Sequence, residues 1–229
     1  MIKKNQKGKV RIFLVDDHPI VRQGLAQLIN HEQDLMVCGE AENARTAIEL
    51  LPECKPDFLI VDISLKGGMD GIELIKTIRS RDTDLPVLVL SMHDESLYAE
   101  RALRAGALGY IMKQEGMEKM ITAIRRVLDG RVYVSEEMDS RMLQQAVRGQ
   151  PNKPVSPLEL LSDRELEIFG LLGQGVGSRE IAESLFLSVK TVDSYRANIK
   201  EKLKIKNSIQ LLQHALQWVG REKSVKSAK

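Results

Sequence analysis

The chain has 229 residues, of which 43% are hydrophobic and 29% are charged, and its formal net charge is +2. This composition is typical of a globular protein with one large or two modest domains, and it excludes a wholly disordered chain. With no apolar stretch long enough to span a membrane, no signal peptide and two cysteines without CxxC spacing, the sequence predicts a cytoplasmic protein with reduced thiols and no membrane partner.

The first half of the chain alternates short apolar runs with helical patterns. The apolar runs predict buried strands at Arg11–Val15, Leu35–Gly39, Phe58–Val61, Val87–Leu90 and Leu108–Met112. The helical patterns lie at Pro19–Ile29, Ala44–Leu51, Gly71–Arg79, Leu97–Ala105 and Glu115–Leu128. Five successive βα units predict a doubly wound, five-stranded parallel sheet with helices on both faces.

Polar side chains stand at the carboxyl ends of four of these runs. They are Asp16 and Asp17, then Asp62, Ser91 and Lys113. Because ligands bind outside the carboxyl ends of parallel strands, we expect these side chains to meet in one crevice. Three carboxylates, a hydroxyl and an ammonium suit Mg²⁺ held by oxygen, with a phosphoryl group between the metal and the lysine. Taken singly, Asp16-Asp17 could equally be an exposed turn in which Asp17 caps the next helix, whereas Asp62 alone favours a loop aspartate and Lys113 alone a solvated lysine. The prediction therefore depends on their joint placement.

The alternation of strands and helices ends after Gly130. Residues 131–157 are expected to form a linker that contains one helix, Glu136–Val147, and then a segment rich in proline and polar residues, 148–157. This composition indicates a boundary between a first domain at residues 10–130 and a second at residues 158–220.

The second domain has an entirely helical pattern. The first predicted helix begins at the capping-box sequence Ser162-Asp-Arg-Glu165 and ends at Leu172, and the second is Ser178–Leu185. The third is capped by Ser188 and ends near Lys204, and the fourth is Ile209–Val219. The short turn before the third helix predicts a helix-turn-helix, which can place its second helix in a DNA major groove. On the last helix, Leu212, Leu216 and Val219 are expected to share one side and to close the core or contact a partner.

Both halves of the chain resemble known families. Residues 10–130, with their strand-end aspartates, serine and lysine, resemble the receiver domain of two-component response regulators. The second domain resembles the LuxR-type helix-turn-helix in Leu161-Ser-Asp-Arg-Glu165, Gly175-Val-Gly-Ser-Arg-Glu-Ile-Ala182, Lys190-Thr-Val192, Asn198-Ile199 and Lys202-Leu203. Together they resemble the NarL/FixJ class of response regulators. The resemblance implies a flavodoxin-like α/β receiver followed by a small all-α domain of four helices.

This resemblance implies a role for each acidic residue of the first domain. Asp62 would be the phosphoacceptor, a nucleophile that attacks a phosphohistidine or a small acyl phosphate. Asp17, Asp62 and the backbone carbonyl of Ser64 would bind Mg²⁺ directly, and Asp16 would bind it through water. One feature departs from the family pattern, because Lys66 replaces the usual proline of this loop and Gly67-Gly68 lengthens the loop by one residue.

The resemblance also implies that Lys113, Ser91 and Tyr110 respond to phosphorylation. Lys113 would neutralise the phosphoryl oxygens, and Ser91 would donate a hydrogen bond to them. Tyr110 would follow the movement of Ser91 as an aromatic switch, so that a covalent event becomes a change of surface.

The third helix of the second domain can be divided into two sides by its angular spacing. Val192, Ile199 and Leu203 fall on one side and are expected to face the core. On the rest of the helix, lysines would contact phosphates and shorter side chains would reach base edges, although a solvated charged face is the competing interpretation. The predicted DNA-binding residues are Lys190, Thr191, Asp193, Ser194, Ala197, Asn198, Lys200 and Lys204.

The sequence therefore predicts a transcription regulator, not an enzyme, in which Mg²⁺-dependent phosphorylation of the receiver controls DNA binding. Its expected partners are double-stranded DNA, a sensor histidine kinase or phosphotransfer protein, RNA polymerase, and a second copy of the chain in a homodimer. Two alternatives stay open. One is a DNA-binding regulator whose unphosphorylated receiver only mediates interactions. The other is an Mg²⁺-dependent aspartyl-phosphate hydrolase, which Ser64 disfavours because such enzymes carry an aspartate there as general acid.

Overall fold

The computed structural model describes residues 8–81, 84–147 and 157–227. The chain divides into two compact units, residues 1–149 and residues 150–229. Each unit has its own set of buried hydrophobic side chains. Among the described residues, no helix combines the length and the apolar character needed to cross a bilayer.

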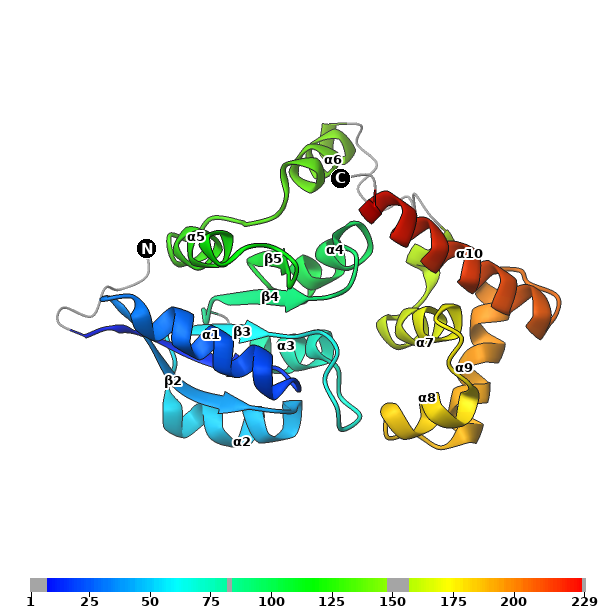
Figure 1. Cartoon of the computed structure of the whole chain (residues 1–229), viewed down its shortest axis with the longest axis horizontal. Coiled ribbons are helices and arrows are strands. Elements are labelled where there is room, and N and C mark those ends of the chain that lie inside the picture. Colours follow the sequence, from blue (N-terminus) through cyan, green and yellow to red (C-terminus); the bar gives the residue numbers. More distant parts are fainter. Residues whose placement is uncertain (1–7, 82–83, 148–156, 228–229) are drawn as a thin grey trace. The chain divides into compact units, whose positions relative to one another are not determined.

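The first unit is built on a parallel sheet of five strands in the order β2-β1-β3-β4-β5 (Figure 1). The strands are β1 Val10–Val15, β2 Leu35–Ala41, β3 Phe58–Val61, β4 Val87–Ser91 and β5 Gly109–Met112. The predicted five-stranded parallel sheet is therefore confirmed. The strand order reverses between β1 and β3, and in open α/β sheets such a switch point is where ligands bind.

Helices cover both faces of this sheet (Figure 1). They are α1 Pro19–His31, α2 Ala44–Cys54, α3 Gly71–Arg79, α4 Glu95–Ala105 and α5 Met117–Leu128. Alternate strand residues such as Ile12, Leu14 and Ile60 pack with α1 and α5 in one buried cluster. The intervening residues, such as Phe13 and Val61, are also fully buried and point to the opposite face, because side chains alternate along a strand.

Several helix boundaries differ by a few residues from the prediction: α1 ends at His31 rather than Ile29, α5 begins at Met117 rather than Glu115, and local capping sets the ends of two others. Helix α2 continues through Pro52 to Cys54, and it ends at Lys55, whose left-handed backbone (φ 41°) lets its N–H donate to the Leu51 carbonyl. Helix α4 begins at Glu95 rather than Leu97, because the Asp94 carboxylate caps the new first turn. None of these shifts changes the positions of the strand ends.

Helix α6, Glu136–Val147, occupies the predicted range and packs against the first unit. The Ser135 N–H donates to the Glu95 carboxylate at 2.8 Å, and Met138 is buried. This helix is therefore joined to α4 rather than free in a linker. Residues 148–156 of the predicted linker lie outside the described residues.

The second unit is entirely helical. It contains the 3₁₀ turn η1 Pro157–Leu160 and the helices α7 Asp163–Gly173, α8 Ser178–Ser184, α9 Val189–Lys202 and α10 Ser208–Ser227. Gly173 allows α7 and α10 to approach closely, since a Cβ at this position would overlap the Ala215 carbonyl. The rings of Phe169 and Trp218 meet beside this crossing with centroids 5.6 Å apart. The predicted all-α second domain is confirmed.

The turn between α8 and α9 spans residues 185–188. Phe186 adopts a left-handed backbone (φ 54°), and the Ser188 hydroxyl accepts from the Thr191 N–H to cap α9. At the other end, α9 stops at Lys202, not near Lys204 as predicted. Lys204 has a left-handed backbone (φ 54°) and lies just beyond the helix, so its predicted place on the exposed side of the helix is wrong, whereas its contact with DNA stays a prediction.

The buried side of α10 also differs from the prediction. Leu211, Ala215 and Val219 are buried, whereas Leu212 is 41% and Leu216 is 47% exposed. Leu212 and Leu216 therefore do not close the core with Val219, because the close crossing at Gly173 centres the core contact on Ala215. The alternative prediction, that they contact a partner, stays a prediction. The exposed leucines form a separate apolar strip on this helix.

Candidate functional site

The loops after β1 and β3 bring three carboxylates together. The side chains of Asp16 and Asp62 are 3% and 2% exposed, and that of Asp17 is 8% exposed. Each offers an oxygen within 4.8 Å of the others and of a nitrogen of His18. The Asp62 N–H donates to the Val15 carbonyl at 2.8 Å, which aligns the ends of the two strands. The predicted meeting of these three aspartates is a feature of the structure.

Lys113 supplies the positive charge inside this cluster. Its Nζ lies 2.6 Å from Asp62 Oδ2 and 2.7 Å from Asp16 Oδ2, and its side chain is only 6% exposed. Its backbone N–H donates to the Ser91 carbonyl at 2.8 Å, which fixes the residue after β5 to the end of β4. One buried ammonium thus bridges two buried carboxylates, which would otherwise repel each other in a poorly solvated site.

The protonation of this pair follows from burial and from its neighbours. The pKa of Asp62 is raised to about 6: burial is the largest cause, the carboxylate of Asp16 adds to it, and the charge of Lys113 opposes both. Burial alone would lower the pKa of Lys113, but the two aspartates outweigh burial and raise that pKa above its ordinary value. Lys113 therefore stays charged throughout the neutral range.

Ser91 and Tyr110 lie beside the cluster, joined through the loop after β4. Both side chains are fully buried. The Ser91 hydroxyl accepts from the His93 N–H at 3.1 Å, and the Tyr110 hydroxyl donates to the His93 carbonyl at 2.9 Å. The His93 ring stacks on Tyr98 with centroids 4.5 Å apart, and its Nε2 lies 2.7 Å from the Ser64 hydroxyl. Burial raises the pKa of Tyr110 well above its usual range, so its hydroxyl keeps its proton.

Sequence reasoning missed three groups that contact the cluster. His18 Nδ1 lies 2.6 Å from Asp17 Oδ1, and Lys66 Nζ lies 3.3 Å from Asp17 Oδ2. The Arg22 guanidinium donates to the Asp16 carbonyl at 2.6 Å. The adjacency of His18 to the aspartate pair was a usable signal, and Arg22 follows it by one helical turn. The reach of Lys66 could not be predicted, because it depends on the conformation of a lengthened loop.

The cluster has the chemistry of a site for a hard divalent cation. Carboxylate oxygens are the preferred ligands of such ions. Within the described part of the chain, Asp16 Oδ2 and Asp17 Oδ1 accept no hydrogen bond of proper geometry, although Lys113 and His18 lie close to them as ion-pair partners. Both oxygens therefore retain the capacity to bind a metal ion. The Ser64 backbone also borders the site, since its N–H donates to Asp62 Oδ1 at 3.3 Å.

The second unit presents a polar surface on α9. Val192 and Ile199 are fully buried, as expected of the core side. Thr191 and Lys200 are half-buried, and the other predicted contact residues on this helix are exposed: Lys190, Asp193, Ser194, Ala197 and Asn198. The Asp193 carboxylate lies 3.5 Å from both Arg196 Nη1 and the Ser178 hydroxyl, so it also ties α9 to the start of α8.

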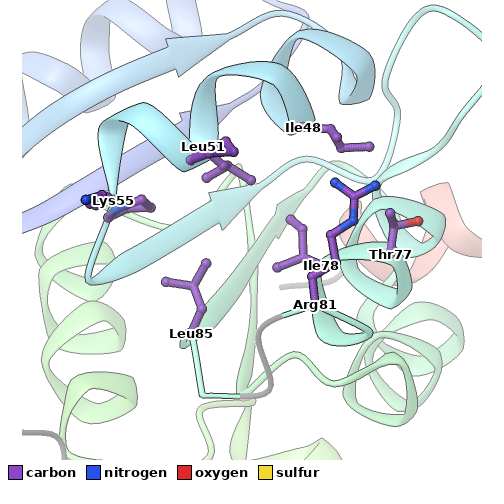
Figure 2. Close-up of a pocket in the computed structure, with 9 residues that line it drawn as sticks. Ile48, Leu51, Lys55, Thr77, Ile78, Arg81 and Leu85 are labelled. Carbon is purple, nitrogen blue, oxygen red and sulfur yellow. The ribbon is translucent and has the colours of Figure 1, made fainter.

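A separate cavity of about 330 Å³ lies between α2 and α3 (Figure 2). Its lining is mainly apolar and includes Ile48, Leu51 and Ile78, with Lys55 and Arg81 among its polar residues. Pro56 and Leu85, which precede β3 and β4, place it toward the amino ends of the strands. The cavity is therefore at the edge of the sheet opposite the carboxylates and is not part of the acidic site.

Comparison with known families assigns both units. Residues 12–125 match the model of the response regulator receiver domain, and residues 159–215 match that of the bacterial regulatory proteins of the luxR family. The chain is a response regulator of the NarL/FixJ class. Its receiver contains the carboxylate cluster, and its luxR-family domain contains α9.

Relatives match this response regulator along most of its length. The oxygen regulatory protein NreC of Staphylococcus epidermidis is 35% identical over 211 residues, which are 90% of this chain and 97% of that protein. The NreC protein of Staphylococcus carnosus is 36% identical over 210 residues, with the same coverage.

Solved structures of response regulators are also similar to this chain. RcsB of Salmonella typhimurium is 28% identical, with a TM-score of 0.67 over 92% of this chain and 98% of that one. RcsB bound to the promoter P1flhDC in the presence of the phosphomimetic BeF3⁻ is 28% identical, with a TM-score of 0.63 over 91% and 98% of the two chains.

Replacing Asp62 with Asn is expected to stabilise the metal-free protein at pH 7. Its folded-state pKa of about 6 lies above the ordinary 3.8, so its ionisation costs stability as pH rises through that interval. A shift of this size corresponds to about 3 kcal/mol, and Asn carries no charge to desolvate. Denaturant unfolding in chelator should show the variant more stable at pH 7, with the difference vanishing near pH 4.

The control is Asp129→Asn, which removes the same charge from an exposed position and should leave stability almost unchanged. Equal or lower stability of the Asp62→Asn protein at pH 7 would contradict the assignment of a costly buried charge.

Proposed function

We propose that this response regulator is switched by phosphorylation of Asp62 and that the switch controls DNA binding by α9. The observation that supports the proposal most is the position of Asp62 at the strand-order reversal, 2.6 Å from the buried ammonium of Lys113 and beside Asp16 and Asp17. The same chain carries a luxR-family domain, so the acidic site and the proposed DNA-binding domain belong to one polypeptide.

The chemistry of the first step is transfer of a phosphoryl group to a carboxylate. A carboxylate oxygen of Asp62 attacks the phosphorus of a phosphohistidine on a sensor kinase or phosphotransfer protein. The new P–O bond forms as the P–N bond breaks, and the imidazole leaves with the electron pair and takes up a proton. Phosphoryl transfer depends mainly on alignment and charge neutralisation, and Lys113 is placed to neutralise the incoming oxygens.

The carboxylate cluster fits Mg²⁺. Asp17 and Asp62, with Asp16 through water and the Ser64 carbonyl, would hold the ion, as the family resemblance implies. When bound, Mg²⁺ supplies neutralisation of the phosphoryl charge and of the three carboxylates. His18 lies within the same group of atoms, but imidazole nitrogen is a softer ligand than Mg²⁺ prefers, so we assign it no metal role.

The switch would run from Ser91 to Tyr110. The Ser91 hydroxyl is held by the His93 N–H, and it would exchange this contact for a phosphoryl oxygen. Because the Tyr110 hydroxyl donates to the His93 carbonyl, a shift of this loop would also move or release Tyr110. The Ser64 hydroxyl contacts the same histidine ring, so the loop after β3 and the loop after β4 would move together.

The DNA contacts would come from the exposed side of α9. The proposed set is Lys190, Thr191, Asp193, Ser194, Ala197, Asn198 and Lys200, with Lys204 just beyond the helix. Lysines would bind phosphates, Ala197 would touch a thymine methyl, and Asp193 would accept from a cytosine amino group or exclude sequences by repulsion. The RcsB structures bound to the P1flhDC and rprA promoters support DNA binding by a chain of this kind, since they are 28% and 29% identical to it over 91% of its length.

The active form would be a homodimer on a two-fold DNA site. The apolar strip of α10 supports this, since Ile209, Leu212 and Leu216 are 71%, 41% and 47% exposed. Burying the strip against a second copy would double the number of phosphates bound and pair two half-sites. RNA polymerase is the further partner through which a bound dimer would change transcription.

Neither alternative is favoured by a particular observation. An interaction-only receiver would not require a buried lysine bridging two buried aspartates. A hydrolase of the aspartyl-phosphate type would need a general acid two residues after its nucleophile, where this chain has Ser64 with its hydroxyl 2.7 Å from the His93 ring. Regulation of transcription is therefore the function we propose.

The proposal predicts a single phosphoryl adduct on Asp62. Intact mass measured after incubation with acetyl phosphate and Mg²⁺ should show the adduct on the wild type, and none on Asp62→Asn or in chelator. Fluorescence anisotropy with a duplex selected from a random library should then show tighter binding by the phosphorylated protein. An adduct of equal yield on Asp62→Asn, or DNA affinity that is indifferent to the adduct, would refute the proposal.

Lys190→Gln should weaken DNA binding without changing base preference, because a lysine on a phosphate carries charge but no sequence information. The slope of log affinity against log salt should fall in magnitude by about 0.9 for each phosphate that the variant no longer neutralises, or about 1.8 for a dimer. The matched control is Lys119→Gln, which removes a lysine that pairs with Glu115 in the receiver. An unchanged salt slope would remove Lys190 from the interface.

A further inference from the structure

Asp17 differs from the other two aspartates in the cations that contact it. Lys113 bridges Asp16 and Asp62 and is buried, with 6% of its side chain exposed. Asp17 instead contacts two exposed side chains: His18 Nδ1 lies 2.6 Å from its Oδ1, and Lys66 Nζ lies 3.3 Å from its Oδ2. Of these two, Lys66 carries a permanent charge, and its side chain is 63% exposed. The carboxylate cluster therefore contacts two lysines: Lys113 is fixed in the interior, and Lys66 lies at the exposed edge of the cluster.

The backbone of the loop after β3 positions Lys66 for this contact. Lys66 forms a parallel β-bridge with Asn43, and its neighbour Leu65 is buried with 3% exposure. Gly67 and Gly68 both adopt left-handed backbones, with φ of 96° and 93°, a conformation that glycine takes without strain. The lysine is thus anchored on one side by a bridge and a buried leucine, and on the other by two glycines that turn the chain away.

We propose that Lys66 is a built-in competitor of the divalent cation at Asp17 and that it lowers the affinity of the site for Mg²⁺. This inference rests on the proposed function, in which Asp17 is a metal ligand. A cation bound to Asp17 meets the ammonium of Lys66 at close range, so the two charges repel and the ion pair has to open. The exposure of Lys66 lets its side chain swing into solvent, where its charge stays hydrated.

The competitor also gives the loop two states. Without metal, the pair with Asp17 ties the loop after β3 to the loop after β1. With metal, Lys66 is released, and the surface beside the acceptor gains a free positive charge. Because an exposed ion pair contributes little free energy, most of the effect comes from repulsion between the bound ion and the ammonium, and we expect about a threefold to tenfold change in affinity.

The experiment is a Mg²⁺ titration of the full chain followed by NMR shifts of the amides that follow β1 and β3. Four proteins are compared with the wild type. Lys66→Gln removes the competitor, and Asp17→Asn removes its partner, alone and combined with Lys66→Gln. Lys55→Gln removes one lysine charge at the opposite edge of the sheet, so it controls for net charge.

We expect Lys66→Gln to bind Mg²⁺ about threefold to tenfold more tightly than the wild type, and Lys55→Gln to bind as the wild type does. In the Asp17→Asn background, removing Lys66 should have a smaller effect, because without the Asp17 carboxylate the exposed ammonium is no longer held beside the bound ion. Equal affinities of the wild type and Lys66→Gln would overturn this inference and leave the proposed function standing. If neither protein binds Mg²⁺, the metal assignment in the proposed function fails and the inference fails with it.

Discussion

The buried ammonium of Lys113 is the group on which the receiver site depends. Three carboxylates at one edge of a sheet repel one another, and each loses hydration when it is buried. Lys113 offsets both costs for Asp16 and Asp62 by lying within 2.7 Å of an oxygen of each. The compensation is incomplete, since burial still raises the pKa of Asp62 to about 6. A buried carboxylate whose charge is only partly compensated is stabilised further when a metal ion binds to it. Such a carboxylate also suits conversion to a phosphoryl derivative.

The backbone of the receiver fixes the positions of these charged side chains. Hydrogen bonds between strand ends join Asp62 to Val15 and Lys113 to Ser91, so the charged side chains emerge at fixed separations. Gly71 contributes on the far side of the loop, where a Cβ would overlap the Asp62 carbonyl. The loop after β4 then links the site to Tyr110 through His93. A change in charge at Asp62 can therefore reach the buried Tyr110 along contacts that already exist.

Much of the fold and of the site could be predicted, because both follow from periodic patterns. The five apolar runs predicted the strands. Because ligands bind at the carboxyl ends of parallel strands, the sequence also predicted that Asp16, Asp62 and Lys113 lie close together. The remaining details depend on tertiary geometry. Lys204 has a left-handed backbone without being glycine, and the buried side of α10 is set by a close crossing at Gly173. The contact of Lys66 with Asp17 depends on two left-handed glycines whose effect no spacing rule describes.

The most direct test of this account is a titration of the Asp62 side-chain carboxyl followed by ¹³C NMR, in chelator and then in Mg²⁺. The account predicts a titration near pH 6 in chelator, from burial against the partial compensation by Lys113. It predicts that Mg²⁺ moves this titration down, because a bound cation favours the carboxylate. A titration at the ordinary value of an aspartate, unmoved by Mg²⁺, would show that Asp62 is neither a costly buried charge nor part of a metal site.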